Sequence, residues 1–146
     1  MKHKGSTTDY LRQRDDALMK AYRDALRAAD TAAPYNYPDI CRRVADSPSP
    51  RFWVSEERAA AVIGAIENGK PLPPMRGARR EMFAEIHRRY LKEKAADPGG
   101  TVFALAVKIV NSPAPKFYLT PLTVGDFIQR IKKRRRQDAI HRRQTT

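Results

Sequence analysis

The chain has 146 residues, of which 41% are hydrophobic, so it can bury the core of one compact domain or of two small packed units. Its formal net charge of +13 is larger than solubility requires and favours a polyanionic partner. The single cysteine excludes an intramolecular disulfide framework and favours a reducing compartment. The N-terminal residues lack the apolar region of a secretory signal, and no run is long and apolar enough to span a bilayer, so we expect a soluble, cytoplasmic protein.

The positive charge is concentrated in the second half of the chain. Residues 1–69 carry 11 Lys and Arg against 10 Asp and Glu, a net charge of +1. Residues 70–146 carry 18 Lys and Arg against 6 Asp and Glu, a net charge of +12. Solubility alone does not require this asymmetry. The second half is therefore predicted to contact a polyanion.

A twelve-residue segment occurs twice, 65 residues apart. Residues 44–55 read Val-Ala-Asp-Ser-Pro-Ser-Pro-Arg-Phe-Trp-Val-Ser, and residues 109–120 read Ile-Val-Asn-Ser-Pro-Ala-Pro-Lys-Phe-Tyr-Leu-Thr. They align without a gap, with four of the twelve positions identical, and the apolar positions of the flanking helices align at the same offset. We therefore predict an all-α protein built by internal duplication from two tandem three-helix units, packed as one pseudo-twofold helical domain.

Helical periodicity and capping residues predict three helices in the first unit, residues 1–69. The first helix starts near residues 6–9 and fades before Pro34, which prevents its continuation. The second has Pro38 in its first turn and ends near Ala45. The third follows Ser55, a good N-cap, and ends at residues 68–69, an Asn-Gly pair.

The repeat predicts the same three helices in the second half. A stiff proline-rich linker at residues 70–76 leads into the second unit, residues 77–136. Thr120 is the expected N-cap of its third helix, with Pro121 at the first helical position. After about Gln129 the sequence is so basic that we expect the helix to fray, and residues 137–146 are predicted to form a disordered polar and basic tail.

Turn chemistry accounts for the repeated segment itself. The prolines restrict the turn, an aromatic residue holds it to the core, and the final hydroxyl caps the next helix. Side chains alternate in an extended segment, so Phe52 and Phe117 are predicted to be buried, and Trp53 and Tyr118 half-exposed. Lys116 then lies beside a helix N-terminus, where it could help to hold a phosphate.

Basic side chains in the second unit predict a nucleic-acid interface. A helix, a turn and a capped helix are compatible with a helix-turn-helix reader, but a small helical bundle has the same pattern, and the turn of about eight residues is longer than usual. The third helix of the first unit begins with Glu56 and Glu57, which repel phosphates, so the second unit is the candidate. The predicted contacts are Arg76, Arg79, Arg80, Arg88, Arg89, Lys92, Lys116, Thr123, Gln129, Arg130, Lys132, Lys133, Arg134, Arg135 and Arg136. We expect duplex DNA more than RNA, in a regulatory or architectural role.

The alternative hypothesis is a structural or protein-interaction module. In it, Trp53 and Tyr118 of the repeated segment contact a partner protein, which would place one docking site on the first unit. An enzyme is not expected, because the sequence has no nucleophile elbow, phosphate-binding glycine loop or paired metal-ligand motif, and its three histidines are far apart. No catalytic residue, cofactor or metal site is therefore predicted.

Overall fold

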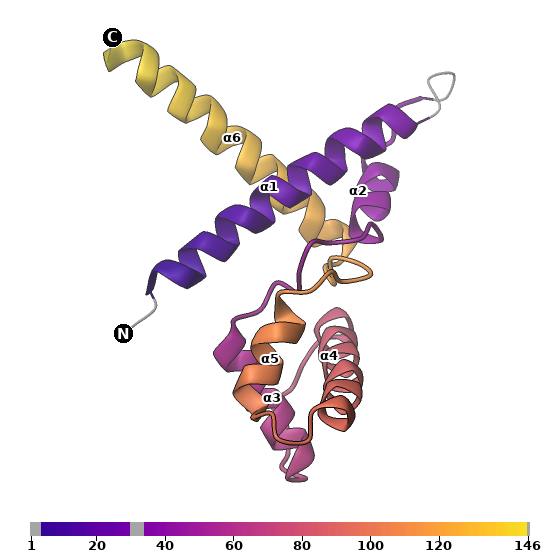
Figure 1. Ribbon diagram of the computed structural model, residues 1–146. Helices are drawn as coiled ribbons and strands as arrows, with labels where there is room; N and C mark the ends of the chain where they lie inside the picture. The colour runs from indigo at the N-terminus through magenta and orange to yellow at the C-terminus, as the bar shows by residue number, and fades with distance from the viewer. Residues whose placement is uncertain (1–3, 30–33, 146) are drawn as a thin grey trace. The chain divides into compact units, whose positions relative to one another are not determined.

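The chain folds into α-helices, as the sequence predicts. The computed structural model describes residues 4–29 and 34–145, and within them no β-strand forms. The helices are α1 (Lys4–Ala28), α2 (Tyr37–Ala45), α3 (Glu56–Glu67), α4 (Gly77–Ala96), α5 (Val102–Val110) and α6 (Pro121–Thr145). Figure 1 shows their order along the chain. The first helix was predicted to fade around residues 29–33; α1 ends at Ala28, and residues 30–33 lie outside the described residues.

The helices form two compact units whose membership does not follow chain order. One unit, here the α6 unit, comprises Met1–Ser47 and Leu119–Thr146 and contains α1, α2 and α6; the other, the α4 unit, comprises Pro48–Tyr118 and contains α3, α4 and α5. The predicted units at residues 1–69 and 77–136 grouped each third helix with the two helices before it. In the structure α3 packs against α4 and α5, and α6 packs against α1 and α2. Hydrophobic periodicity shows that a helix has an apolar stripe but not which pair of helices that stripe contacts.

Local sequence explains the helix boundaries in the α4 unit. The Ser55 side chain accepts a hydrogen bond from the backbone N–H of Arg58 at 3.0 Å, which makes it the N-cap of α3. Gly69 follows the end of α3 with φ of 65°, a conformation that favours glycine. Apolar side chains from all three helices and from the segments beside them form the core, including Phe52, Val62, Ile63, Phe83, Ile86, Leu105 and Ile109.

The α6 unit is built from two long helices and one short one. α1 and α6 cross, and each continues past the crossing (Figure 1). Leu18 of α1, Val44 of α2 and Ile128 of α6 are each fully buried. The Tyr37 hydroxyl donates a hydrogen bond to the Gly125 carbonyl at 2.8 Å and joins α2 to α6. The Asn36 side chain caps α2, and Pro38 lies in its first turn, as expected.

The repeated segments lie between helices and contact each other. Ser49 and Ala114 form an isolated antiparallel bridge, with N–H to carbonyl distances of 2.9 and 2.8 Å. Phe52 and Phe117 are 1% and 2% exposed, which confirms that the shared phenylalanine is buried. The prediction for Trp53 is wrong, because its ring is only 7% exposed. The segment bends at several residues instead of running as a regular strand, so its side chains do not alternate between two faces.

The predicted fraying of the last helix and the disordered tail do not occur in the described residues. α6 remains helical through its run of basic residues to Thr145. Two carboxylates of α1 offset the repulsion between these cations: Asp15 pairs with Arg134 at 2.7 Å, and Asp16 pairs with Arg135 at 3.1 Å. Asp138 lies four residues before Arg142, a spacing that supports a helix. Thr146 lies outside the described residues.

No helix in the described part of the chain combines the length and apolarity that crossing a membrane requires.

Candidate nucleic-acid interface

Positive charge is present in both structural units. The residues of the α6 unit carry 17 Lys and Arg against 9 Asp and Glu, a net charge of +8. The residues of the α4 unit carry 12 against 7, a net charge of +5. The steep asymmetry between the halves of the sequence is therefore much smaller between the folded units, because the very basic α6 joins the unit that contains the N-terminal helices.

The predicted contact residues divide between the two units. Seven lie in the α4 unit: Arg76, Arg79, Arg80, Arg88, Arg89, Lys92 and Lys116. Eight lie in the α6 unit: Thr123, Gln129, Arg130, Lys132, Lys133, Arg134, Arg135 and Arg136. Their surroundings differ enough to separate the side chains that maintain the fold from those that are exposed.

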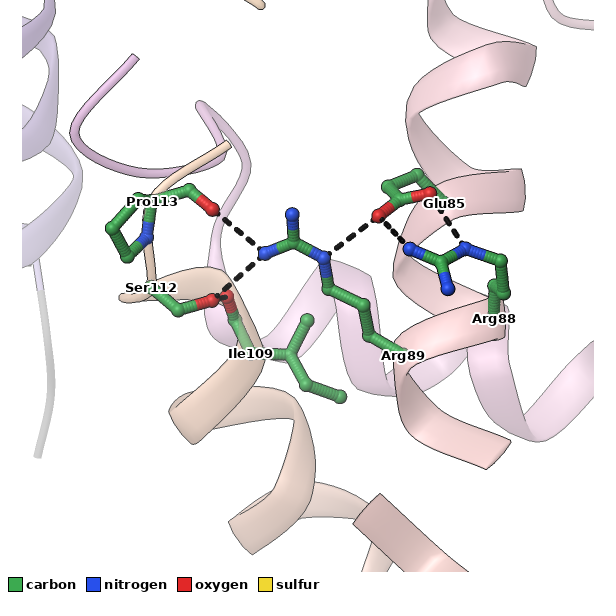
Figure 2. A network of polar contacts seen from close by, with 6 residues as sticks. All are labelled: Glu85, Arg88, Arg89, Ile109, Ser112 and Pro113. Atoms are coloured by element: carbon green, nitrogen blue, oxygen red, sulfur yellow. Dashed lines mark hydrogen bonds and ion pairs between the residues drawn. The ribbon is translucent and has the colours of Figure 1, made fainter. Parts of the chain in front are cut away.

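Arg89 is a structural residue of the α4 unit. Figure 2 shows its guanidinium between Glu85 of α4 and the segment that follows α5. Its Nε donates to Glu85 Oε2 at 2.8 Å, and its Nη1 donates to the Pro113 carbonyl at 2.7 Å and to Ser112 Oγ at 3.2 Å. The same guanidinium lies over the Phe52 ring, 4.9 Å from its centroid. A side chain with these contacts is not available to a ligand.

Glu85 is the acceptor at the centre of this network. Arg88 Nε and Nη2 donate to its two carboxylate oxygens at 2.9 and 2.6 Å, a bidentate geometry. The hydrogen bonds from Arg88, with a smaller contribution from Arg89, outweigh the effect of burial and lower the pKa of Glu85 to about 2. The carboxylate therefore stays charged, and it neutralises part of the basic character of α4. Arg88 itself is exposed at the edge of the network.

Lys116 and Tyr118 lie together at a shallow polar hollow of the α4 unit. The hollow has a volume of about 310 Å³ and is lined by Glu81, Ala84, Glu85, Arg88, Lys116 and Tyr118. Lys116 Nζ pairs with Glu81 at 3.3 Å, so no unpaired cation remains at this place to hold a phosphate. The Tyr118 ring is half-buried, as predicted, and stacks on Phe52 with the centroids 5.9 Å apart. Its φ of 58° is unusual for a residue with a side chain.

The start of α4 carries three exposed arginines. Arg76, Arg79 and Arg80 are all exposed, and the positive end of the helix dipole disfavours cations there. The Arg79 guanidinium lies 5.3 Å from the Phe83 centroid, and Arg80 makes a long 3.5 Å hydrogen bond to the Met75 carbonyl. Lys92, about three turns further on, is exposed as well. These side chains can meet an anion without breaking an ion pair that supports the fold.

Several cations of α6 are held by α1. The pairs of Arg134 with Asp15 and of Arg135 with Asp16 are described above. Lys132 Nζ donates to the Tyr22 hydroxyl at 2.9 Å and lies 4.5 Å from the centroid of that ring. These contacts fix the rotation and direction of α6 where it leaves the core. Asp15 and Asp16 were not among the predicted site residues, because sequence spacing does not show which helix lies opposite a charge.

Two polar residues in the first half of α6 lie within its unit. Thr123 donates its backbone N–H to the Thr120 side chain at 3.1 Å, the N-cap contact of the helix. Gln129 lines an apolar hollow together with Tyr37, and burial raises the pKa of Tyr37 to about 12. Arg130 lies 6.0 Å from the Phe127 centroid. Of this part of the predicted set, only Arg130 extends an uncompensated charge into solvent.

Lys133 and Arg136 are the most available cations of α6. Both are exposed, and neither makes an ion pair or a hydrogen bond among the residues that the structure describes. Ile140 and Arg143, which were not in the predicted set, continue the same exposed face. The spacing of three and four residues from Lys133 to Arg143 could have identified them, but only if the helix was expected to continue beyond Gln129.

Comparisons with known proteins add no family assignment. No protein-family model matches the sequence, and neither do the curated proteins or the solved structures compared with it. The candidate site is therefore defined by the residues and contacts described above.

Proposed function

We propose that the protein binds duplex DNA without catalysing a reaction, through the exposed cations on the last four turns or so of α6. One observation carries this proposal: α6 continues as a helix beyond its last buried residue, Ile131, and the extension is exposed and strongly basic. Repulsion between its like charges destabilises such a helix when it is surrounded by water alone. A polyanion would relieve that repulsion and release counterions.

Duplex DNA suits this surface better than the other nucleic acids. The major groove of B-form DNA is about 12 Å wide and admits an α-helix, whereas that of A-form RNA is deep and narrow. Single strands are usually bound by exposed aromatic rings on which bases stack. The extension of α6 from residue 132 to residue 145 contains no aromatic residue other than His141.

Binding and its salt dependence provide the first test. We would measure fluorescence anisotropy of a labelled 30-base-pair duplex, of the matching single strand and of the matching RNA duplex, between 50 and 200 mM salt. We expect the DNA duplex to bind most tightly, and affinity to fall steeply with salt because each phosphate contact contributes about 0.9 to the logarithmic slope. Absence of salt-sensitive binding to every probe at micromolar protein would refute the proposed function.

Charge-matched variants then locate the interface. One variant changes Lys133, Arg136 and Arg143 to Gln, and the control changes Arg76, Arg79 and Arg80 to Gln, so both lose three positive charges. If α6 carries the interface, the first variant should lose far more affinity than the control, which should change little. The reverse result would transfer the interface to the start of α4.

A protein-docking surface is the second candidate, and a different observation favours it. Leu122 is 79% exposed beside an apolar hollow of about 300 Å³ in the α6 unit. The hollow is lined by Tyr37, Pro38, Cys41, Pro121, Leu122, Gly125, Asp126 and Gln129. Trp53 gives this candidate no support, because its ring is buried, and Tyr118 is half-buried against Phe52. A Leu122→Asp variant should lose a protein partner in a pull-down while keeping its helical circular dichroism; unchanged capture would argue against the hollow.

We also propose that the chain is an internal duplication in which the two repeats exchange their third helices. α2 and α5 begin and end 65 residues apart, and so do the first residues of α3 and α6. Ser55 and Thr120 cap their helices with equivalent contacts, and Ser49 and Ala114, which pair in the bridge, are also equivalent. Each unit then contains two consecutive helices of one repeat and the third helix of the other. The pseudo-twofold packing stays a prediction.

A further inference from the structure

The exposed face of the α6 extension carries one regular row of side chains. Lys133, Arg136, Ile140 and Arg143 follow one another at spacings of three, four and three residues, which places them on the same side of a helix. All four are exposed, Ile140 to 53%. We call these four residues the α6 stripe. From Lys133 to Arg143 the stripe extends about 15 Å, at a rise of 1.5 Å per residue.

The stripe lies away from the contacts that hold α6 in its unit. The buried face of the helix runs through Val124, Ile128 and Ile131. The same face continues through Arg135, which pairs with Asp16. Since successive residues are 100° apart, Arg136 and Ile140 lie roughly opposite Asp138 and Arg142, the next two residues on the core-side row. The stripe is therefore the outer face of the extension, and the ion pairs of Arg134 and Arg135 with α1 hold the helix at other positions.

The composition of the stripe argues against a second helix as its partner. Helices that pair through a coiled-coil seam need apolar residues at nearly every position spaced three or four apart. Here a single isoleucine lies between cations, and continuing the row toward the start of the helix adds Gln129 and Asp126 before Leu122. Three cations around one apolar side chain are complementary to a partner surface that has an apolar group with negatively charged groups on both sides of it.

We infer that the α6 stripe enters the DNA major groove and contacts base edges there. This inference rests on the proposed function and adds a mode of recognition to it. Lys and Arg side chains donate to the O6 and N7 acceptors of guanine, and an isolated aliphatic side chain contacts the thymine methyl group. Phosphates line both edges of the groove, where Arg130 and the outer edges of the extension can meet them. The stripe thus predicts a preference for a short site that contains guanine and thymine.

Selection from a random duplex library, followed by methylation interference, tests this mode of binding. The full chain is incubated with a library of 30-base-pair DNA duplexes, the bound fraction is amplified over several rounds, and the enriched duplex is methylated with dimethyl sulfate. Methylation at guanine N7 reports the major groove, and methylation at adenine N3 reports the minor groove. We expect enrichment of a short motif and interference at guanine N7 within it.

Variants assign the contact to the stripe. Arg136→Gln and Ile140→Ala, both at exposed positions, should each reduce the preference for the enriched duplex over a scrambled one by roughly 5- to 150-fold, the effect of one base contact. Arg76→Gln in α4 should leave that preference unchanged. Circular dichroism of each variant checks that it is folded.

The possible failures are distinguishable. If the full chain binds no nucleic acid at all, the proposed function fails and the inference with it. If the chain binds DNA but the library is not enriched, or interference occurs at adenine N3, the inference is overturned while the proposed function stands. The inference is also overturned if an enriched motif is read equally well by the stripe variants.

Discussion

Replacing Arg89 should destabilise the α4 unit, although the residue belongs to a row of basic side chains that the sequence assigns to nucleic-acid binding. In Arg89→Met the aliphatic stem is kept, but the hydrogen bonds to Glu85, Ser112 and the Pro113 carbonyl are lost, as is the guanidinium over Phe52. A hydrogen bond to a charged group contributes about 1.5–3 kcal/mol, and part of this is recovered when water reaches the exposed Pro113 carbonyl. We therefore expect a loss of about 2–3 kcal/mol in the free energy of unfolding of the α4 unit.

The neighbouring residue provides a matched control. Arg88→Met removes a guanidinium from the same carboxylate, but Arg88 is exposed, and within the described part of the chain its hydrogen bonds stay within α4. The loss of stability should therefore be much smaller than for Arg89→Met. Urea unfolding can be followed by the fluorescence of Trp53, the single tryptophan, which lies in the α4 unit and is buried. Equal midpoints for the two variants would refute a structural role for Arg89. A large loss of DNA affinity in a stably folded Arg89→Met protein would also contradict it.

Three further predictions concern protonation and packing. The pKa of Glu85 is lowered to about 2 from an ordinary 4.5, so its ionised form should stabilise the folded state by about 1–2 kcal/mol. This stabilisation is complete above pH 4.5 and is lost as the pH falls toward 2. Glu85→Gln should therefore reduce the pH dependence of unfolding in that range. Gly125→Ala should lower the thermal stability of the protein, because the added Cβ would lie 3.2 Å from the Tyr37 ring. Gly64→Ala in α3 should instead stabilise the protein by about 0.5–1 kcal/mol, because nothing lies within 4 Å of the added Cβ. A change of the same sign in both variants would refute this account of the packing. Burial raises the pKa of the Cys41 thiol, so it should react with iodoacetamide much more slowly at pH 8 in native protein than in urea, and equal rates would show that the site is open.

Sequence patterns predicted the features that depend on neighbouring residues in the chain. The end of α3 at Gly69 and the caps at Ser55 and Thr120 follow from residue types that satisfy the helix ends locally. The burial of Phe52 and Phe117 followed from the two copies of one segment, because a residue kept in both turns has the same packing role in both. These predictions did not require knowledge of which helices touch.

Features that depend on tertiary neighbours were not accessible in the same way. The run from Arg134 to Arg136 predicts fraying when α6 is considered alone, and the carboxylates that offset it lie more than a hundred residues earlier in the chain. Arg88 and Arg89 are equivalent in composition, yet only Arg89 reaches the segment after α5. Trp53 was assigned to an outer face by strand alternation, which does not hold in a segment that bends. In each case a distant contact overrides a correct local tendency.

The ordered extension of α6 has an energetic consequence for the proposed binding. A disordered basic tail would have to become helical on DNA, and ordering it would reduce the net affinity by part of the interaction energy. In the structure the helix is already formed, and the pairs of Asp15 and Asp16 with Arg134 and Arg135 hold its base, so the α6 stripe presents its side chains before any ligand arrives. We therefore expect the far-ultraviolet circular dichroism of the protein to remain nearly constant when duplex DNA is added. Asp15→Asn combined with Asp16→Asn should remove the ion pairs that fix the direction of the extension. The more positive net charge should favour non-specific association with DNA. The loss of a fixed direction should reduce the preference for an enriched duplex. A large rise in helicity when the unaltered chain binds DNA would show that the free extension is unfolded, and would remove the basis for a pre-formed reading helix.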